Sequence, residues 1–187
     1  MKKRSFLAGG LLAVLTTACT TSGTSGGDPA ARRSSIDSSV DAALSKLYGQ
    51  VQGSRELTGK AKGVLVFPSV VSAGLGVGGS YGQGALRVGG RSVGYYSTTA
   101  ASVGLLAGAD SKAVFVLFMT QESLDKFRAS SGWTAGADAS VTMLKVGANA
   151  AIDTQTAQQP IIGFALSNAG LMANLSLDGT KISRLEL

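Results

Sequence analysis

The stretch AGLGVGGSYGQGAL, residues 73–86, constrains the fold of this chain most, because glycine recurs in it at alternate positions. Five glycines share one parity: Gly74, Gly76, Gly78, Gly82 and Gly84. Side chains alternate between the two faces of an extended strand, so these glycines leave one face bare while Leu75 and Val77 occupy the other. Each glycine costs a strand roughly 0.5–1 kcal/mol relative to alanine. The pattern therefore predicts a strand that another element approaches closely, or a sheet that coils strongly.

The bare glycine face has two candidate occupants. One is a neighbouring element of the fold, such as a helix or Trp133, packed directly on the glycines. The other is a lipid chain that enters a groove along them. The sequence leaves both interpretations open.

Part of the same stretch, GLGVGG at 74–79, satisfies the glycine spacing of a dinucleotide-binding loop. Such a loop needs a helix directly after the glycines and an acidic residue about twenty positions later. Residues 80–85 hold too much glycine to begin a helix, and residues 94–99 contain neither Asp nor Glu. A Walker phosphate loop is excluded as well, because Gly59-Lys60 is followed by Ala61 and not by Ser or Thr. We therefore expect no nucleotide ligand.

The N-terminus has the organisation of a secretory signal. A basic start, KKR at 2–4, precedes a short apolar run at 6–15, which is much shorter than the ~20 residues of a membrane-spanning helix. Ala18-Cys19 then resembles a bacterial lipobox, and Cys19 is the only cysteine of the 187-residue chain. We expect residues 1–18 to be a signal peptide and Cys19 to carry the lipid. Thr20, in place of aspartate, favours the outer membrane by the same resemblance, with the domain facing the periplasm.

Cleavage before Cys19 changes the charge balance. The chain holds 17 Lys and Arg against 11 Asp and Glu; removal of three basic residues leaves 14 against 11. This mild positive charge suits anionic headgroups and argues against a nucleic-acid partner. Residues 19–33 then predict a lipidated cysteine with a flexible tether, because they contain no large apolar side chain that could order them.

Residues 34–187 predict one α+β domain. Apolar residues spaced three and four apart predict an amphipathic helix over 36–52, with a short helical turn over 55–62. GVLVFPSVV at 63–71 predicts a strand with a bend or sheet edge at Pro68. Gly89-Gly90 and Asp178-Gly179 are typical of two-residue hairpin turns.

A further helix is expected between strands, capped by Thr120 and ending near Ser130. The remaining strand-like runs, 140–148, 161–167, 171–177 and 181–185, favour an antiparallel set. The resulting fold class is α+β, with a largely antiparallel, strongly curved or barrel-like glycine-rich sheet.

Catalytic groups are scarce in this sequence. It has no histidine, a single cysteine and no pair of carboxylates at a suggestive spacing. These absences remove the commonest general base, the usual thiol nucleophile and most zinc chemistry. We expect no enzyme activity, no metal and no cofactor.

Several motifs follow one another at short separations: KAKGVLVFP at 60–68, the glycine stretch, YYS at 95–97, FMT at 118–120, FRASSGW at 127–133, ASVT at 139–142 and GLMANLSLDGTK at 170–181. Together they resemble the SYLF domain, a lipid-binding family also called the yeast actin-patch type, over residues 34–187. The resemblance implies phospholipid binding, with phosphoinositide recognition in eukaryotic relatives and actin binding in some yeast ones. Export argues against actin for this chain, and the 36–52 helix, with Lys46 as its one lysine, lacks the basic character of the eukaryotic membrane-contact helix.

The leading hypothesis is a non-catalytic, membrane-anchored lipoprotein whose domain binds phospholipid by headgroup or acyl chain. The candidate headgroup residues are Lys60, Lys62, Arg87 and Arg91, because basic groups at a hairpin tip can meet one phosphate. The alternative is an envelope protein that binds a protein partner and touches lipid only through Cys19.

Overall fold

The computed structural model describes residues 28–144, 158–167, 170–172 and 176–187, and in residues 76 and 102–109 the backbone alone. Its helices are α1 (Pro29–Gln50), α2 (Ser54–Lys60) and α3 (Gln121–Ala129). Its strands are β1 (Gly63–Val88), β2 (Arg91–Phe118), β3 (Gly132–Thr134), β4 (Thr142–Met143), β5 (Ile161–Ser167), β6 (Gly170–Leu171) and β7 (Lys181–Leu185). The expected α+β class is confirmed, with the expected mostly antiparallel and strongly curled sheet.

A hairpin of two very long strands forms most of the sheet. β1 and β2 pair antiparallel from Gly63↔Phe118 to Val88↔Arg91, with register shifts near Pro68 and Gly76. The turn between them has Gly89 and Gly90 at φ +57° and +79°, as the two-glycine motif predicted. Pro68 lies at the first register shift, which confirms the expected bend.

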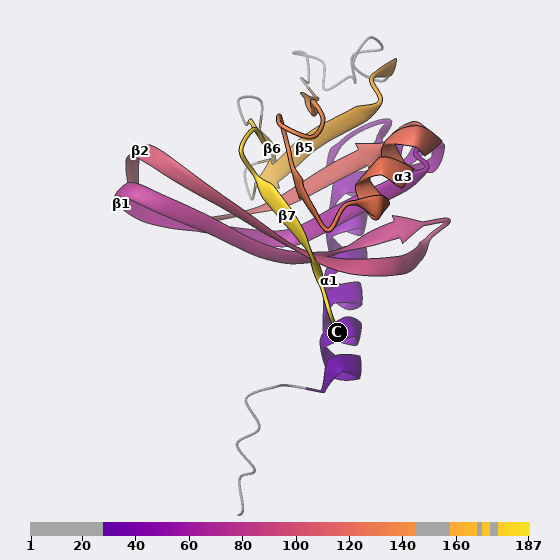
Figure 1. Ribbon diagram of the computed structural model, residues 1–187, viewed down its shortest axis with the longest axis horizontal. Helices are drawn as coiled ribbons and strands as arrows, with labels where there is room; N and C mark the ends of the chain where they lie inside the picture. The colour runs from indigo at the N-terminus through magenta and orange to yellow at the C-terminus, as the bar shows by residue number, and fades with distance from the viewer. Residues whose placement is uncertain (1–27, 145–157, 168–169, 173–175) are drawn as a thin grey trace, which may run out of the picture.

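The remaining strands extend the sheet from β2. The strand order is β3-β7-β2-β5-β4, β1 pairs with β2, and β6 pairs with β5. β7 pairs with the first part of β2, around Tyr96, while β5 pairs with its last part, around Phe115. In Figure 1 the hairpin curls back on itself, so these two parts of the sheet face different directions.

Alternate residues of the strands pack into two apolar cores, one for each face of the sheet. One core combines α1 and α2 with strand residues that include Val66, Phe115 and Phe164. The other core combines α3 and Trp133 with Phe67, Phe118 and their neighbours. The helix pair and α3 therefore cover opposite faces, as expected from the period-two apolar pattern of the strands.

The first helix begins earlier than the sequence analysis expected. The predicted tether reaches Arg33, whereas α1 starts at Pro29. Asp28 accepts a hydrogen bond from the Ala30 amide, and proline at the first helical position needs no such partner. Arg33 then donates to the Leu187 carbonyl, which ties the start of α1 to the C-terminus. A local cap and a tertiary contact thus order residues that are too polar to order themselves.

The other predicted elements are mostly confirmed. α2, α3 with its Thr120 cap, β5 and β7 lie where they were expected, and Gly179 has φ +78° in the second turn. The run at 140–148 is wrong as an antiparallel strand, because its described part forms only β4, which pairs parallel with β5. The run at 171–177 forms strand only at its first residue, within β6; Met172, Ser176 and Leu177 are not strand, and residues 173–175 lie outside the described part.

Within the described residues, no helix combines the length and apolar character needed to cross a bilayer.

Candidate functional site

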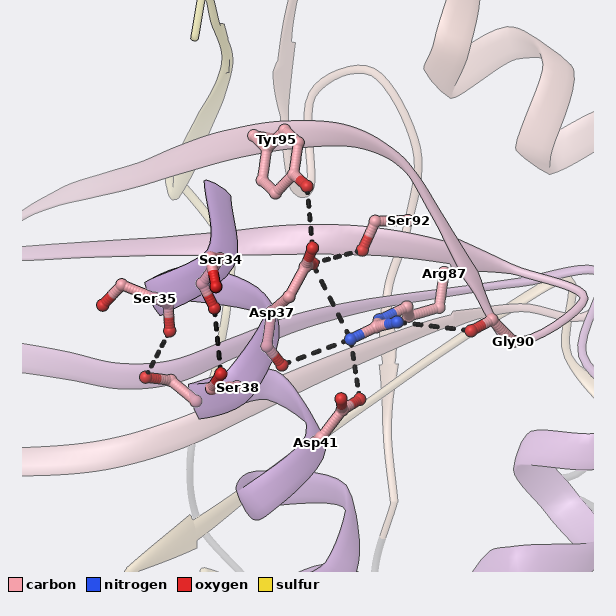
Figure 2. A network of polar contacts seen from close by, with 10 residues as sticks. Ser34, Ser35, Asp37, Ser38, Asp41, Arg87, Gly90, Ser92 and Tyr95 are labelled. Carbon is pink, nitrogen blue, oxygen red and sulfur yellow. Dashed lines mark hydrogen bonds and ion pairs between the residues drawn. The ribbon is translucent and has the colours of Figure 1, made fainter. Parts of the chain in front are cut away.

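A polar network fastens the N-terminal half of α1 to the sheet. Asp37 of α1 accepts hydrogen bonds from the Ser92 hydroxyl at 2.5 Å and the Tyr95 hydroxyl at 2.9 Å, both on β2 (Figure 2). Burial raises the pKa of the Tyr95 phenol above its usual value of 10.0, and the hydrogen bond to Asp37 raises this pKa further. Tyr95 therefore remains a protonated donor to Asp37 across the physiological pH range.

Arg87 near the end of β1 lies at the centre of this network. Its Nη2 is 2.6 Å from Asp41 Oδ1 and 3.7 Å from Asp37 Oδ1 (Figure 2). The guanidinium also donates to the Asp37 and Gly90 carbonyl oxygens, each at 3.2 Å, while its buried Nε has no hydrogen-bond partner among the described residues. With its side chain only 13% exposed, Arg87 connects α1 to the β1–β2 turn.

The candidate headgroup residues are distributed around this junction. A hollow of about 430 Å³ opens between α1, α2 and the β1–β2 turn. The residues that line it are Asp41, Leu44, Tyr48, Arg55, Thr58, Gly59, Ala61, Val64, Arg87, Gly89 and Gly90. It is thus bordered by the sequence neighbours of Lys60, Lys62 and Arg91, all three of which are exposed. The structure brings the two predicted basic segments, 60–62 and 87–91, to one hollow.

Arg87 differs from the other three candidates. Its charge is already matched by two carboxylates, so it is poorly placed to bind an incoming phosphate. Arg55 of α2, which the sequence analysis did not select, lines the same hollow with its guanidinium carbon 4.3 Å from the Tyr48 ring centroid. The density of basic residues from 55 to 62 was the available signal for it. Arg55, Lys60, Lys62 and Arg91 therefore form the available cationic set, which we call the basic rim.

The glycine stretch is part of β1, and the contacts show what lies on its bare face. A Cβ placed on Gly84 would lie 1.9 Å from the Val66 carbonyl oxygen, and one on Gly82 would lie 2.8 Å from the Ser69 carbonyl oxygen. The neighbour is therefore the first part of the same strand, reached because β1 doubles back. The expected packing of a helix or Trp133 on these glycines is wrong; Trp133 instead packs edge-on against Phe127, with ring centroids 5.7 Å apart.

A second hollow, of about 610 Å³, adjoins this doubled strand. It lies between α1, which contributes Ser35, Ile36 and Ser39, and β1, which contributes Pro68, Ser69, Val71, Ala73 and residues 79–83. The hollow borders Gly82 but does not reach the tight contact at Gly84. It is one of the hollows that border the glycine stretch.

Two further predictions concern ligands. Cys19, the predicted lipid attachment point, lies outside the described residues. Among the residues that the structure does describe, no three His, Cys, Asp or Glu side chains gather in a way that could hold a metal ion.

Comparison with known families identifies part of the chain. The family model Ysc84, described as "Las17-binding protein actin regulator", matches residues 99–186. This region runs from within β2 through β7 and includes the FMT, FRASSGW and GLMANLSLDGTK motifs. A search of curated proteins finds no match to the chain. Residues 99–186 therefore match the Ysc84 family, which is the family of the SYLF domain.

Proposed function

We propose that this chain is a non-catalytic, lipid-anchored envelope protein whose SYLF domain binds the anionic headgroups of phospholipids. The family is associated with lipid and actin binding, and its description is one of binding and regulation. Of these two activities we assign lipid binding to this chain, because the predicted export signal argues against contact with actin.

The observation that supports this proposal most is that the two basic segments, residues 60–62 and 87–91, border the same hollow. Residues 60–62 and 87–91 are separated by almost the whole of β1, yet both border the cavity between α1, α2 and the β1–β2 turn. Of the basic rim, Arg55 lines this space of about 430 Å³, while Lys60, Lys62 and Arg91 are exposed and adjoin, in sequence, residues that line it. Each basic group near an anionic surface contributes about 1 kcal/mol, and an arginine can hold a phosphate with two parallel hydrogen bonds.

The membrane location rests on the N-terminal sequence. A signal peptide over 1–18 and a lipidated Cys19 would hold the domain at the outer membrane, facing the periplasm. The ten residues from Cys19 to Asp28 span at most about 35 Å. The domain would therefore remain close enough to the bilayer for weak headgroup contacts to act.

The description of the family names a protein partner, Las17, so an envelope protein-binding module is the second candidate. In that case lipid contact comes only through Cys19. The two candidates differ in whether the domain without its acyl chain binds phospholipid vesicles. A lipid-binding domain would bind them, and a protein-binding module would not.

Charge reversal at the basic rim tests the proposal. All described elements lie within residues 28–187, so a chain that starts at Thr20 keeps the whole described structure and lacks the acyl group. We expect this chain to sediment with phosphatidylcholine vesicles that contain phosphatidylglycerol at low salt. Lys60→Glu with Lys62→Glu should weaken this binding about tenfold or more.

The matched control is Lys126→Glu with Arg128→Glu on α3, which changes the charge equally on the opposite face of the sheet. This control should retain most of the binding. Absence of vesicle binding by the unaltered chain, or equal losses in the two variants, would contradict the headgroup site. Arg87→Glu is unsuitable for this test because it would add a third carboxylate beside Asp37 and Asp41.

A further inference from the structure

We propose that the doubled-back end of the β1–β2 hairpin inserts its apolar side chains into the interface of a phospholipid bilayer. We call this end the hairpin bend and define it as residues 71–81 of β1 with residues 99–109 of β2, which pair with residues 73–81. The proposal extends the proposed function, on which it rests, from headgroups to the apolar layer beneath them.

The hairpin bend carries most of the exposed large apolar side chains of the described residues. Leu75 is 83% exposed and Val77 is 70% exposed, while Tyr81 and Val71 are about half exposed. Val93 is the one such residue outside the bend. Single exposed apolar residues are ordinary on soluble proteins, but four within eleven residues of one strand form a patch that marks an interaction surface.

The glycines of β1 explain why these apolar side chains are exposed to solvent, because they allow the strand to reverse direction. A Cβ on Gly74 would lie 2.4 Å from the Gly78 Cα, so β1 reverses direction within a few residues there. Leu75 and Val77 lie within this reversal. In Figure 1 the bend is the end of the hairpin that carries the labels β1 and β2, and it projects away from the three helices. The apolar face that the alternating pattern predicted is therefore directed away from either core.

The chemistry of the bend matches a bilayer interface. Residues 73–81 and their partners 99–109 contain no Asp, Glu, Lys or Arg, and the first charged side chain beyond them is the exposed Asp110, opposite Ser72. Insertion of Leu75 and Val77 would therefore not require a charged side chain between them to leave water. The two strands pair with each other on both sides of Gly76, which satisfies the inward-facing backbone groups. Among the described residues, no other strand pairs with the outer edges of residues 73–81 or 100–109, which limits insertion to the shallow depth of about 5–10 Å that is typical of interfacial segments. Tyr81, half exposed further along β1, has the amphipathic ring that favours this depth.

The chain ahead of α1 indicates a membrane as the occupant. Ten residues connect the predicted lipid on Cys19 to Asp28, and even fully extended they span at most about 35 Å. α1 then begins, and its Ser35, Ile36 and Ser39 share the 610 Å³ hollow with residues 79–81 of the bend. The start of α1 therefore borders one edge of the hairpin bend, at residues 79–81, and the short tether limits how far the domain can move from the bilayer.

A fluorescent probe at residue 75, within the hairpin bend, tests this inference. The chain from Thr20 contains no cysteine, so Leu75→Cys provides a unique site for the environment-sensitive probe NBD. The control is Lys126→Cys on α3, which is also exposed but lies at the opposite face of the sheet from α1. With vesicles of phosphatidylcholine and phosphatidylglycerol, we expect the probe at 75 to shift to the blue and to be quenched by doxyl-labelled lipid. The probe at 126 should show neither change.

The outcomes separate this inference from the proposed function. If the protein sediments with vesicles but the probe at 75 remains in water, the inference is wrong and headgroup binding stands. If nothing sediments, the proposed function itself fails. A blue shift at 75 that appears without vesicles and increases with protein concentration would assign the bend to a second copy of the chain and overturn the inference.

A second variant avoids the probe. Leu75→Ser with Val77→Ser changes two exposed side chains, so circular dichroism and the urea midpoint should match those of the unaltered chain. Vesicle partitioning should nevertheless decrease about tenfold, because apolar area no longer leaves water on binding. Unchanged partitioning would also overturn the inference.

Discussion

Gly84 shows at the scale of a residue why the glycine stretch is needed. The atom that would clash with a Cβ there is a backbone carbonyl oxygen, 1.9 Å away, so no side-chain rotation can relieve the contact. Gly84→Ala should therefore lower the free energy of unfolding by about 2–3 kcal/mol, through forced separation of the two parts of β1. Urea denaturation measures this change.

Gly49 in α1 provides a matched control, because a Cβ there would meet nothing within 4 Å. Gly49→Ala should raise the free energy of unfolding by about 0.5–1 kcal/mol, since alanine favours the helix. Equal stability of the two alanine variants would show that the close approach at Gly84 is not required.

Tyr96 makes the fold sensitive to alkaline pH. Its ring is 6% exposed, and burial raises the pKa of its phenol above 10.0. Below pH 10 the phenol is protonated in both the folded and the unfolded chain. Above pH 10 the unfolded chain releases a proton that the folded chain retains, so the free energy of unfolding falls as the pH rises. Tyr96→Phe removes this contribution.

We therefore expect the unaltered chain to lose more stability between neutral pH and pH values above 10.0 than Tyr96→Phe does. Urea denaturation at both pH values gives the comparison. Some alkaline loss should remain in the variant because the pKa of Tyr95 is raised as well. Identical losses in the two proteins would contradict this role of Tyr96.

At the scale of an element, Arg87 holds α1 on the sheet. Replacement by alanine removes the 2.6 Å contact with Asp41 and the hydrogen bonds to two carbonyl oxygens. Hydrogen bonds to charged groups that are largely buried contribute about 1.5–3 kcal/mol, so Arg87→Ala should destabilise the protein by this amount in urea denaturation.

Lys126→Ala is the comparison for Arg87. Lys126 also forms a short ion pair, 2.7 Å from Glu122, but both side chains are 76% exposed. Exposed pairs contribute only about 0–1 kcal/mol because water screens them. If the two alanine variants lose similar stability, Arg87 does not fasten α1 in the way described.

The elements that the sequence predicted well depend on local chemistry. The Gly89-Gly90 turn, the Thr120 cap and the strand at 161–167 follow from a few adjacent residues. The start of α1 was missed because it depends on one capping side chain, Asp28, at the edge of a polar segment. The parallel pairing of β4 with β5 was missed because it joins segments almost twenty residues apart, which a local pattern cannot show.

At the scale of the whole molecule, α1 links the two regions assigned to lipid. Its first turns border the hollow beside the hairpin bend, and its later turns, at Asp41, Leu44 and Tyr48, border the hollow beneath the basic rim. Residues 35 and 48 are about 20 Å apart along a helix. Contact of both regions with one bilayer would therefore place α1 along its surface.

Neither region could be read completely from the sequence. The two basic segments could be recognised in the sequence, but their proximity in the fold depends on how β1 packs against the helices. The alternation placed Leu75 and Val77 opposite the glycines but did not say whether that face is covered, and the structure leaves both side chains exposed at the reversal near Gly74. Burial of an apolar residue is a property of the assembled sheet, and a strand that doubles back changes which face is covered.

Binding of the chain from Thr20 to vesicles of increasing phosphatidylglycerol content, at low and at high salt, tests the central claim most directly. If the SYLF domain binds anionic headgroups, the bound fraction rises with the phosphatidylglycerol content and falls as salt is added. If the bound fraction remains at the background level on every vesicle at low salt, the domain does not bind anionic phospholipid, and any lipid contact is left to the predicted anchor at Cys19.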